Sequence, residues 1–429
     1  MAYIGSTPTS QNFISGTDYF NGTGSQTAFT LTRPVNSVND VEVVVNNVIQ
    51  QPNSYTVSGT TLTLSAAPSS GTSNVYVRYL ATNQQSFTVG NNTVGYNQLT
   101  SDMQSKFAMK NRIINGAMVI DQRNAGASVA LTNGYCLDRF VCNSSQTNKF
   151  TTQQNAGSVT PPPGFTNYLG VTSSSSYSVI SSDSMWIGQR IEGYNVADLN
   201  WGTANASSVT FSFWVRSSLT GTFGGSVFNG AANRFYVYSY VINSANTWEQ
   251  KSITIPGDTT GTWLKDNGIG LAVLWSVGTG STYLGAAGSW GSTVYTGVIG
   301  QQNVVGTNGA TFYITGVQLE VGTSATGFEY RQYQQELALC QRYYEYGLTF
   351  SGPAPAGLNP FISQTFIVTK RATPSISVTA NTSITGGSAG TTYYSGTGQP
   401  YMPDTIKFVL TNPTAGNSIG ATWTASAEL

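Results

Sequence analysis

The stretch 209-VTFSFWVRSS-218 decides the fold of the largest part of this chain. Apolar and polar side chains alternate along it, and successive side chains of a β-strand point to opposite faces. One face therefore has the apolar residues Val209, Phe211, Phe213 and Val215. The other face has Thr210, Ser212, Trp214 and Arg216. We expect the first set in a core and the second set on a surface available for contacts.

Similar segments recur on both sides of this strand. They are rich in aromatic and β-branched residues, lack helical periodicity and are separated by loops of Gly, Asn and Ser, which is typical of an antiparallel sandwich or jelly roll. The segments are NRFYVYSYVI at 233–242, KSITIP at 251–256, IGLAVLWSVG at 269–278 and ATFYITGVQLEVG at 310–322. A jelly-roll β-sandwich is predicted for residues 131–330.

The rest of the chain is predicted to form smaller units. Alternating Val, Tyr and Leu with turns at Asn46-Asn47 and Ser58-Gly59 predict a β-sandwich module over residues 1–85. The stretch ELALCQRYYEY places apolar side chains on one side of a predicted helix over 331–346, which we expect to dock on a sheet; these are Leu337, Cys340, Tyr343 and Tyr344. Further strand-like runs predict a small β-rich domain over 347–429. The fold class is therefore mainly β.

Residues 86–130 are predicted to form a neck or linker with a short helix. Spacings of three, four and four place Tyr96, Leu99, Met103 and Phe107 on one apolar stripe. A helix this short is marginal in water, so the stripe must pack on something. We consider two packing partners for the stripe: its own domain, or the same helix of sister chains in an oligomeric neck.

Composition limits the chemistry. The 429 residues include no histidine. Eighteen residues are basic and 18 are acidic. A Ser-His-Asp triad, a histidine-bearing zinc site and an HExxH helix are thereby excluded. Lys and Arg are not clustered as binding to nucleic acid requires. No run of apolar residues is long enough for a membrane-spanning helix. No Gly-rich nucleotide-binding motif is complete. We assign no catalytic residue, metal or cofactor.

A glycosidase would need two carboxylates about 5–9.5 Å apart. The acids considered for such a pair are Glu192, Asp198, Asp258, Asp266, Glu320 and Glu329. We expect these to accept hydrogen bonds from loop amides instead. The three cysteines, Cys136, Cys142 and Cys340, are predicted to be buried free thiols.

Several strings, in this order along the chain, resemble tail-fibre and receptor-binding proteins of tailed bacteriophages. They are NRIINGAMVIDQRN at 111–124, YCLDRF at 135–140, QRIEG at 189–193, FYITGVQLEVGTSATGFEYR at 312–331, ELALCQRYYE at 336–345, KRATPSI at 370–376 and SAEL at 426–429. The resemblance covers residues 111–429 and includes a jelly roll similar to carbohydrate-binding modules. Residues 1–85 resemble the small attachment modules that begin other phage fibres.

The resemblance implies a parallel homotrimer whose N-terminal module docks on other tail proteins and whose distal domains bind a bacterial surface polysaccharide. A long repetitive shaft, collagen-like Gly triplets and a self-cleaving chaperone tail are all missing, so a short fibre or an adaptor fits as well as a long fibre. The first residues do not read as a secretory signal. The surface composition nevertheless suits an extracellular protein. A virion protein, which is made in the host cytoplasm and released by lysis, would combine such a surface with the lack of a secretory signal.

Sugar recognition by a neutral protein needs flat aromatic faces with polar groups beside them. Trp and Tyr suit this task because each has an apolar body, a polar handle and few rotatable bonds. The candidates, several in Gly-, Ser- and Thr-rich loops, are Trp201, Trp214, Trp263, Trp290, Tyr283 and the pair Tyr393 and Tyr394. The leading hypothesis is a glycan-binding, non-enzymatic tail fibre. The alternatives are a glycan depolymerase and an architectural adaptor or head-fibre protein without receptor binding.

Overall fold

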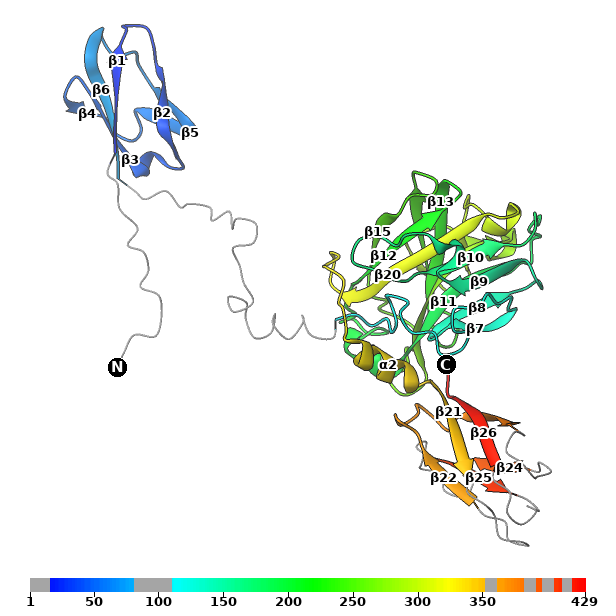
Figure 1. Ribbon diagram of the computed structural model, residues 1–429. Helices are drawn as coiled ribbons and strands as arrows, with labels where there is room; N and C mark the ends of the chain where they lie inside the picture. The colour runs from blue at the N-terminus through cyan, green and yellow to red at the C-terminus, as the bar shows by residue number, and fades with distance from the viewer. Residues whose placement is uncertain (1–15, 81–109, 352–360, 382–390, 396–404, 411–418) are drawn as a thin grey trace, which may run out of the picture. The chain divides into compact units, whose positions relative to one another are not determined.

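The computed structural model describes residues 16–80, 110–351, 361–381, 391–395, 405–410 and 419–429 (Figure 1). It is mostly β, with 45% strand and 8% helix, which confirms the predicted fold class. Contacts divide the chain into residues 1–100 and residues 101–429, and each unit is described by itself. The residues of the predicted neck stripe, Tyr96, Leu99, Met103 and Phe107, lie outside the described residues.

The first unit is a small β-sandwich. A four-stranded sheet in the order β1-β6-β3-β4 faces the two-stranded sheet β2-β5, and side chains of both sheets, among them Phe29, Val43, Leu62 and Val77, form one core. The elements are β1 (Thr17–Gly22), β2 (Ala28–Val35), η1 (Val38–Asp40), β3 (Val41–Val45), β4 (Val48–Ile49), β5 (Tyr55–Leu64) and β6 (Gly71–Tyr79).

The two turns predicted in this module have different outcomes. Asn46 and Asn47 both have positive φ, 50° and 64°, and connect β3 to β4. Positive φ at both central residues is the requirement of a type I′ hairpin, for which Asn is well suited. The turn expected at Ser58-Gly59 is wrong, because both residues lie inside β5. Gly59 adopts φ 58° there, a conformation that glycine reaches without steric cost.

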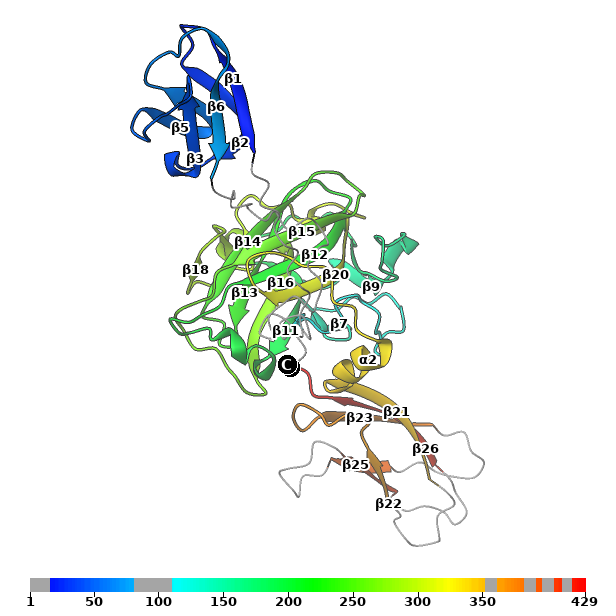
Figure 2. The same ribbon diagram turned by 90° about the vertical axis from the view of Figure 1, so that its left-hand side faces the viewer.

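The second unit contains an antiparallel two-sheet sandwich of the jelly-roll type (Figure 2). The five-stranded sheet has the order β15 (Glu249–Ile255), β12 (Val209–Ser217), β20 (Thr311–Val321), β10 (Leu169–Ser173) and β9 (Phe150–Gln154). The seven-stranded sheet has the order β18 (Trp290–Gly291), β14 (Phe235–Ile242), β13 (Gly221–Asn229), β16 (Ile269–Thr279), β11 (Ser184–Glu192), β8 (Phe140–Ser144) and β7 (Asn133–Leu137).

Short elements connect these strands. A two-stranded parallel pair is formed by β17 (Leu284–Gly285) and β19 (Gly297–Val298). The 3₁₀ turns are η3 (Ala156–Ser158), η4 (Gly193–Asn195), η5 (Ala197–Leu199), η6 (Ser281–Tyr283) and η7 (Val304–Gly306).

The core between the two sheets contains the predicted apolar face of β12. Val209, Phe211, Phe213 and Val215 are all fully buried. The ring of Trp275 on the opposite sheet has its centroid 5.1 Å from that of Phe211 and 5.3 Å from that of Phe213. The second face of β12 differs from the expectation at its start, because Thr210 and Ser212 are buried as well. Thr210 Oγ1 donates to the Gly322 carbonyl, so the segment after β20 covers this part of the sheet.

The predicted helix exists but is shorter at its C-terminal end. It is α2 (Tyr333–Gln341), and Tyr344 already begins the strand β21 (Tyr344–Ser351). Cys340 and Tyr343 are fully buried against Ile114 and Ile120. The helix therefore packs on the segment that precedes the sandwich. The three cysteines are free and buried, as predicted.

The strands after α2 form two three-stranded sheets. One has the order β21, β26 (Ile419–Ser426) and β23 (Ser375–Asn381), and the other has β22 (Phe361–Thr365), β25 (Thr405–Leu410) and β24 (Thr391–Ser395). Buried ion pairs join this region to the rest of the unit. Arg342 binds Glu192 of β11 through two hydrogen bonds of 2.9 and 2.6 Å. Glu428 binds both Arg123 and Arg139.

Candidate functional site

Three of the predicted tryptophans come together at one end of the sandwich. Trp201 follows η5, Trp263 lies in the loop before β16, and Trp290 opens β18. Their ring centroids are 4.7 to 5.4 Å apart and their planes are nearly perpendicular. Edge-to-face contacts of this kind are the preferred geometry of aromatic pairs. Loops far apart in the sequence are thus joined by one aromatic cluster.

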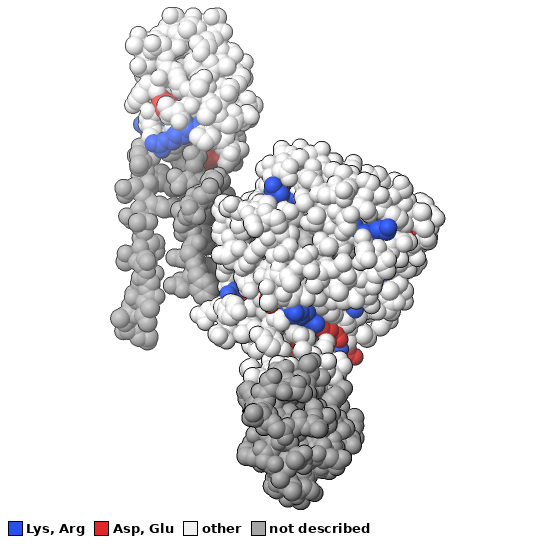
Figure 3. Space-filling model, turned by 45° about the vertical axis from the view of Figure 1, so that its right-hand side comes forward, with Lys and Arg blue, Asp and Glu red and all other residues white. Residues whose placement is uncertain are grey.

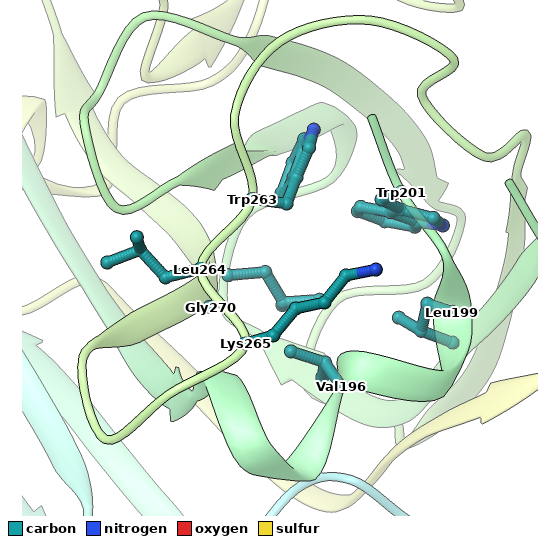
Figure 4. Close-up of a pocket in the computed structure, with 8 residues that line it drawn as sticks. Val196, Leu199, Trp201, Trp263, Leu264, Lys265 and Gly270 are labelled. Carbon is teal, nitrogen blue, oxygen red and sulfur yellow. The ribbon is translucent and has the colours of Figure 1, made fainter. Parts of the chain in front are cut away.

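A small open hollow lies against this cluster (Figure 4). The space in it that a water molecule can enter is about 10 Å³, which is about enough for a single water molecule. It is lined by Val196, Leu199, Trp201, Trp263, Leu264, Lys265, Gly270 and Leu271. In Figure 4 the Lys265 side chain extends across the hollow, with its amine on the side of Trp201 and Leu199.

The indole N–H groups of this cluster are already used. Trp201 donates to the Ser207 carbonyl at 2.7 Å, Trp263 to the Thr260 carbonyl at 3.2 Å and Trp290 to the Pro256 carbonyl at 2.7 Å. Trp201 and Trp263 are also buried, with exposed fractions of 3% and 8%. These rings therefore offer a ligand an apolar wall and no hydrogen-bond donor.

The other predicted residues do not join this cluster. Tyr283 lies in η6 and is half-buried. Tyr393 and Tyr394 lie within β24, not in the expected loop. Trp214 is half-buried on the outer side of β12, where it and Phe165 fill the space beside Gly316. Gly316 has φ 59°, and a Cβ there would meet the Phe165 ring at 2.6 Å and the Trp214 ring at 3.0 Å.

A second aromatic surface, which the sequence analysis missed, lies on the seven-stranded sheet. Met185, Ile187 and Ile191 of β11 point into the core. The alternate residues Trp186 and Gly188 therefore lie on the outer face. Apolar side chains from β7, β8, β13 and β16 contact Trp186 there. We call this set the outer aromatic patch: Tyr135, Val141, Trp186, Phe228 and Leu274.

The register of the sheet explains how the patch forms. Gly188 pairs with Val141 on one side and with Leu274 on the other. A Cβ at Gly188 would clash with the Val273 carbonyl oxygen and would meet Leu274 Cα at 3.0 Å, so the glycine lets β11 and β16 approach closely here. Within the described part of the chain, no partner accepts a hydrogen bond from the Trp186 indole. In this respect Trp186 differs from Trp201, Trp263 and Trp290.

Polar groups surround the outer aromatic patch. Ser226 is fully buried, and its hydroxyl has no partner among the described residues. The Arg190 guanidinium and the Tyr135 hydroxyl both donate to the Leu429 carbonyl, at 2.6 and 2.7 Å. Gln301 donates to the Ser276 hydroxyl at 2.5 Å. These groups and the chain around them leave Trp186 8% exposed and Val141 and Leu274 fully buried, whereas Tyr135 and Phe228 are half-buried.

The signal for this patch was present in the string SMWIGQRIE at 184–192. Alternation assigns Met185 and Ile187 to one face and Trp186 to the other, as it does for β12. An aromatic residue on the side of a strand that faces away from the core, followed two positions later by glycine, could have been chosen as a binding candidate.

The carboxylates considered for catalysis all have partners. Glu320 accepts from the Thr326 amide at 2.8 Å, and Glu329 accepts from the Asn111 amide at 2.6 Å. Loop amides also bind Asp258 and Asp266, as predicted. Glu192 and Asp198 instead bind arginines, Arg342 and Arg112. No group of three or more metal-binding side chains occurs within the described ranges.

One buried carboxylate is unusual. Asp138 is 1% exposed, and burial raises its pKa from 3.8 to about 6, although the Gln122 amide and side chain donate to it. A carboxyl whose folded pKa is raised binds a proton more readily in the folded state, so its contribution to stability decreases as pH rises from about 4 to about 6.

Asp138→Asn should therefore flatten the pH dependence of unfolding. Between pH 4.5 and pH 7, the wild type should lose about 1–3 kcal/mol of stability relative to the variant, because each pKa unit corresponds to about 1.4 kcal/mol. Urea unfolding of both proteins at the two pH values measures this difference. Parallel pH profiles would contradict the raised pKa.

Charged side chains are few over the visible surface, and basic and acidic ones lie together in one area (Figure 3). None of the helices in the described part of the chain has the length and apolar character needed to cross a bilayer.

Comparisons with known proteins gave matches among solved structures only. No family model and no curated protein matches the chain. A domain of tailspike protein 4 of bacteriophage CBA120 matches 49% of this chain with 11% identity and a TM-score of 0.28; this chain covers 21% of that one. A putative sugar-binding protein from Bacteroides thetaiotaomicron matches 50% of the chain with 11% identity and a TM-score of 0.28, over 100% of its own length.

A family 11 carbohydrate-binding module from Clostridium thermocellum, solved with a mixed-linked tetrasaccharide, is a further match. It covers 47% of this chain and 98% of its own, with 12% identity and a TM-score of 0.24. All three are likenesses at low identity and low TM-score, and they carry no argument about function.

Proposed function

We propose that this chain is a non-enzymatic bacteriophage tail fibre that binds a glycan on the bacterial surface. The observation that supports this most directly is the outer aromatic patch, with Trp186 at its centre. The solvated face of an antiparallel sheet is ordinarily polar, whereas this cluster is apolar and leaves Trp186 8% exposed and Tyr135 and Phe228 half-buried. Aromatic rings beside hydrogen-bonding groups can cover the C–H faces of sugars and satisfy their hydroxyls.

The rest of the proposal concerns the virion. Residues 1–85 attach the fibre to other tail proteins, and the chains associate as a homotrimer through the neck stripe. The protein is made in the host cytoplasm without a signal peptide and is incorporated into the phage tail. The ordered strings between residues 111 and 429 support this part of the proposal. The Trp201, Trp263 and Trp290 cluster, Trp214, Tyr283, Tyr393 and Tyr394 remain candidate sugar contacts.

The number of linked binding sites determines how strongly the phage particle adheres to a cell. A single shallow sugar site binds weakly, at about millimolar Kd, whereas linked sites can gain about 10²–10⁴ in avidity. Three chains in one fibre and several fibres on one particle would therefore hold a cell without any one site being tight.

The test uses the full-length protein in the oligomeric state that it adopts when purified. Trp186→Ala should weaken binding to the recognised glycan by about tenfold or more, which corresponds to about 1.4 kcal/mol. Because Trp186 is only 8% exposed, the substitution should also lower the free energy of unfolding, so a melting curve must show that the variant is folded at the temperature of the binding assay. A glycan array identifies the ligand, and adsorption of purified protein to host cells measures binding. Trp214→Ala, on the other sheet, is the comparison variant: if the site lies at Trp186 and not at Trp214, it should bind normally.

Other outcomes identify the alternatives. Loss of binding in Trp214→Ala with normal binding in Trp186→Ala would move the site to the five-stranded sheet. Release of reducing ends from the host polysaccharide would identify a depolymerase. Wild-type protein that neither adsorbs to host cells nor competes with virions would indicate an architectural adaptor.

A further inference from the structure

The four-stranded sheet of the N-terminal module has an apolar row on its outer face. Val43 and Val77 point into the core of the module, so the alternate residues of β3 and β6 point outward. The register of the sheet places one residue of each of its four strands side by side on that outer face. We call these residues the module row: Tyr19 of β1, Tyr76 of β6, Val44 of β3 and Ile49 of β4.

The two ends of the module row are open to solvent. Tyr19 is 64% exposed and Ile49 is 63% exposed, whereas Tyr76 is half-buried and Val44 is buried. The ring centroids of Tyr19 and Tyr76 are 5.7 Å apart. The solvated face of an antiparallel sheet is ordinarily polar, and a contiguous exposed apolar surface marks a contact with another molecule.

One acidic and one basic side chain lie beside the row. Glu42 of β3 and Arg78 of β6 are paired across the two central strands, two residues from Val44 and Tyr76 and on the same face. They form an ion pair of 3.3 Å, in which the Arg78 side chain is 58% exposed. Both charges are therefore placed to meet a surface that covers the row.

This pattern is complementary to itself. A two-fold axis parallel to the strands, between β3 and β6, would stack a second copy face to face on the module and exchange β3 with β6 and β1 with β4. Each Arg78 then lies opposite the other copy's Glu42. Each Tyr19 likewise lies opposite the other copy's Ile49. The strands of both copies keep the same direction, and stacked sheets commonly have nearly aligned strands.

We propose that the N-terminal modules of two copies of this chain pair face to face through the module row. The matching of Arg78 with Glu42 in both directions favours a second copy over an unrelated protein, because a two-fold contact uses the same surface on both partners. A two-fold contact cannot serve three modules equally, so in a homotrimer it joins modules of two different trimers. A contact of this size is weak on its own and gains strength where copies are linked. The inference goes beyond the proposed function.

The test mixes two charge-reversed variants of the full-length protein. Glu42→Arg and Arg78→Glu should each associate about tenfold more weakly than the wild type or worse, because like charges then face each other across the contact. An equimolar mixture of the two should recover association, since one variant has two basic and the other two acidic groups at these positions. The ion pair within each chain stays broken in the mixture, so recovery reports contact between copies. Sedimentation or light scattering over a range of concentrations measures the mass.

Two neighbouring residues of β4 provide a matched test of the apolar contact. Ile49 and Val48 are 63% and 61% exposed, but successive side chains of a strand point to opposite faces, and only Ile49 belongs to the row. Ile49→Ala should weaken association by about tenfold, because each pair of copies loses the side chain twice. Val48→Ala should leave association unchanged. Both variants should fold normally because both residues are exposed.

Three results would overturn the inference: a wild-type mass that does not rise with concentration, a mixture that does not recover association, or equal effects of Ile49→Ala and Val48→Ala. If Ile49→Ala leaves self-association intact but abolishes binding to another tail protein, the row docks on that protein and the inference is wrong. Glycan binding is measured separately, so its dependence on Trp186 stands or fails independently of this contact.

Discussion

Glu345→Gln should lower the free energy of unfolding of the C-terminal unit by about 3–5 kcal/mol, because it leaves a buried lysine without its charge partner. Lys370 is 1% exposed and Glu345 is 2% exposed. The Lys370 amine donates to Glu345 at 2.6 Å and also to the carbonyls of Gln341 and Val368. Burial lowers the pKa of Lys370, and the carboxylate opposes that effect.

The amide of glutamine keeps the shape and an acceptor oxygen for the Ile367 amide, so the measured loss reports the charge. The double variant Glu345→Leu with Lys370→Met should recover much of the stability, since replacing a buried ion pair by apolar residues is often neutral. Glu42→Gln breaks the exposed pair with Arg78 in the N-terminal module and should cost less than about 1 kcal/mol. Similar losses in Glu42→Gln and Glu345→Gln, from chemical unfolding, would contradict the argument.

The second large effect concerns the core of the jelly roll. Trp275→Ala should lower the free energy of unfolding by about 3–5 kcal/mol, the usual cost of removing a large buried aromatic side chain. Trp275 is fully buried between the two sheets and contacts Phe211 and Phe213. Thermal or urea unfolding measures the loss.

Trp275→Phe is the matched variant. The indole N–H of Trp275 is buried without a hydrogen-bond partner among the described residues, and an unsatisfied buried donor is costly. Phenylalanine removes that donor and keeps one ring, so its cost should be well below that of alanine. A loss in Trp275→Phe equal to that in Trp275→Ala would contradict this argument, because phenylalanine fills most of the volume that alanine leaves empty.

The sequence was most informative where one physical effect dominates. Alternation along β12 predicts the fully buried Phe211 and Phe213 because a two-sheet core imposes a period of two. The same rule did not predict the burial of Thr210 and Ser212, because covering of the outer face depends on a segment about one hundred residues further along the chain. Local pattern contains no information about such a contact.

The ends of elements were harder to predict. The apolar spacing that predicts a helix at Leu337 and Cys340 continues to Tyr344, yet α2 ends at Gln341. Tyr344 instead pairs with Ser426 in a sheet. Pairing with a strand that is distant in sequence decides this boundary, and helix periodicity does not reveal it.

The candidate site was predicted in part. Composition directed attention to tryptophans in loops, and Trp201, Trp263 and Trp290 do meet in space. Sequence alone could not show that their indole N–H groups bind backbone carbonyls, or that Lys265 lies at the hollow. Trp186 was overlooked because attention was given to loops, although strand alternation placed it on an outer face.

The ion pairs between the jelly roll and the strands after α2 also bear on how the protein would respond to mechanical load. Glu192 lies in the middle of the chain, and its partner Arg342 lies at the start of the last strands; Glu428 is held by Arg123 and Arg139. Separating the strands after α2 from the jelly roll would break both sets of ion pairs, because each set has partners on both sides. Under tension, the distal sheets should stay attached until several buried charges are exposed to water at once.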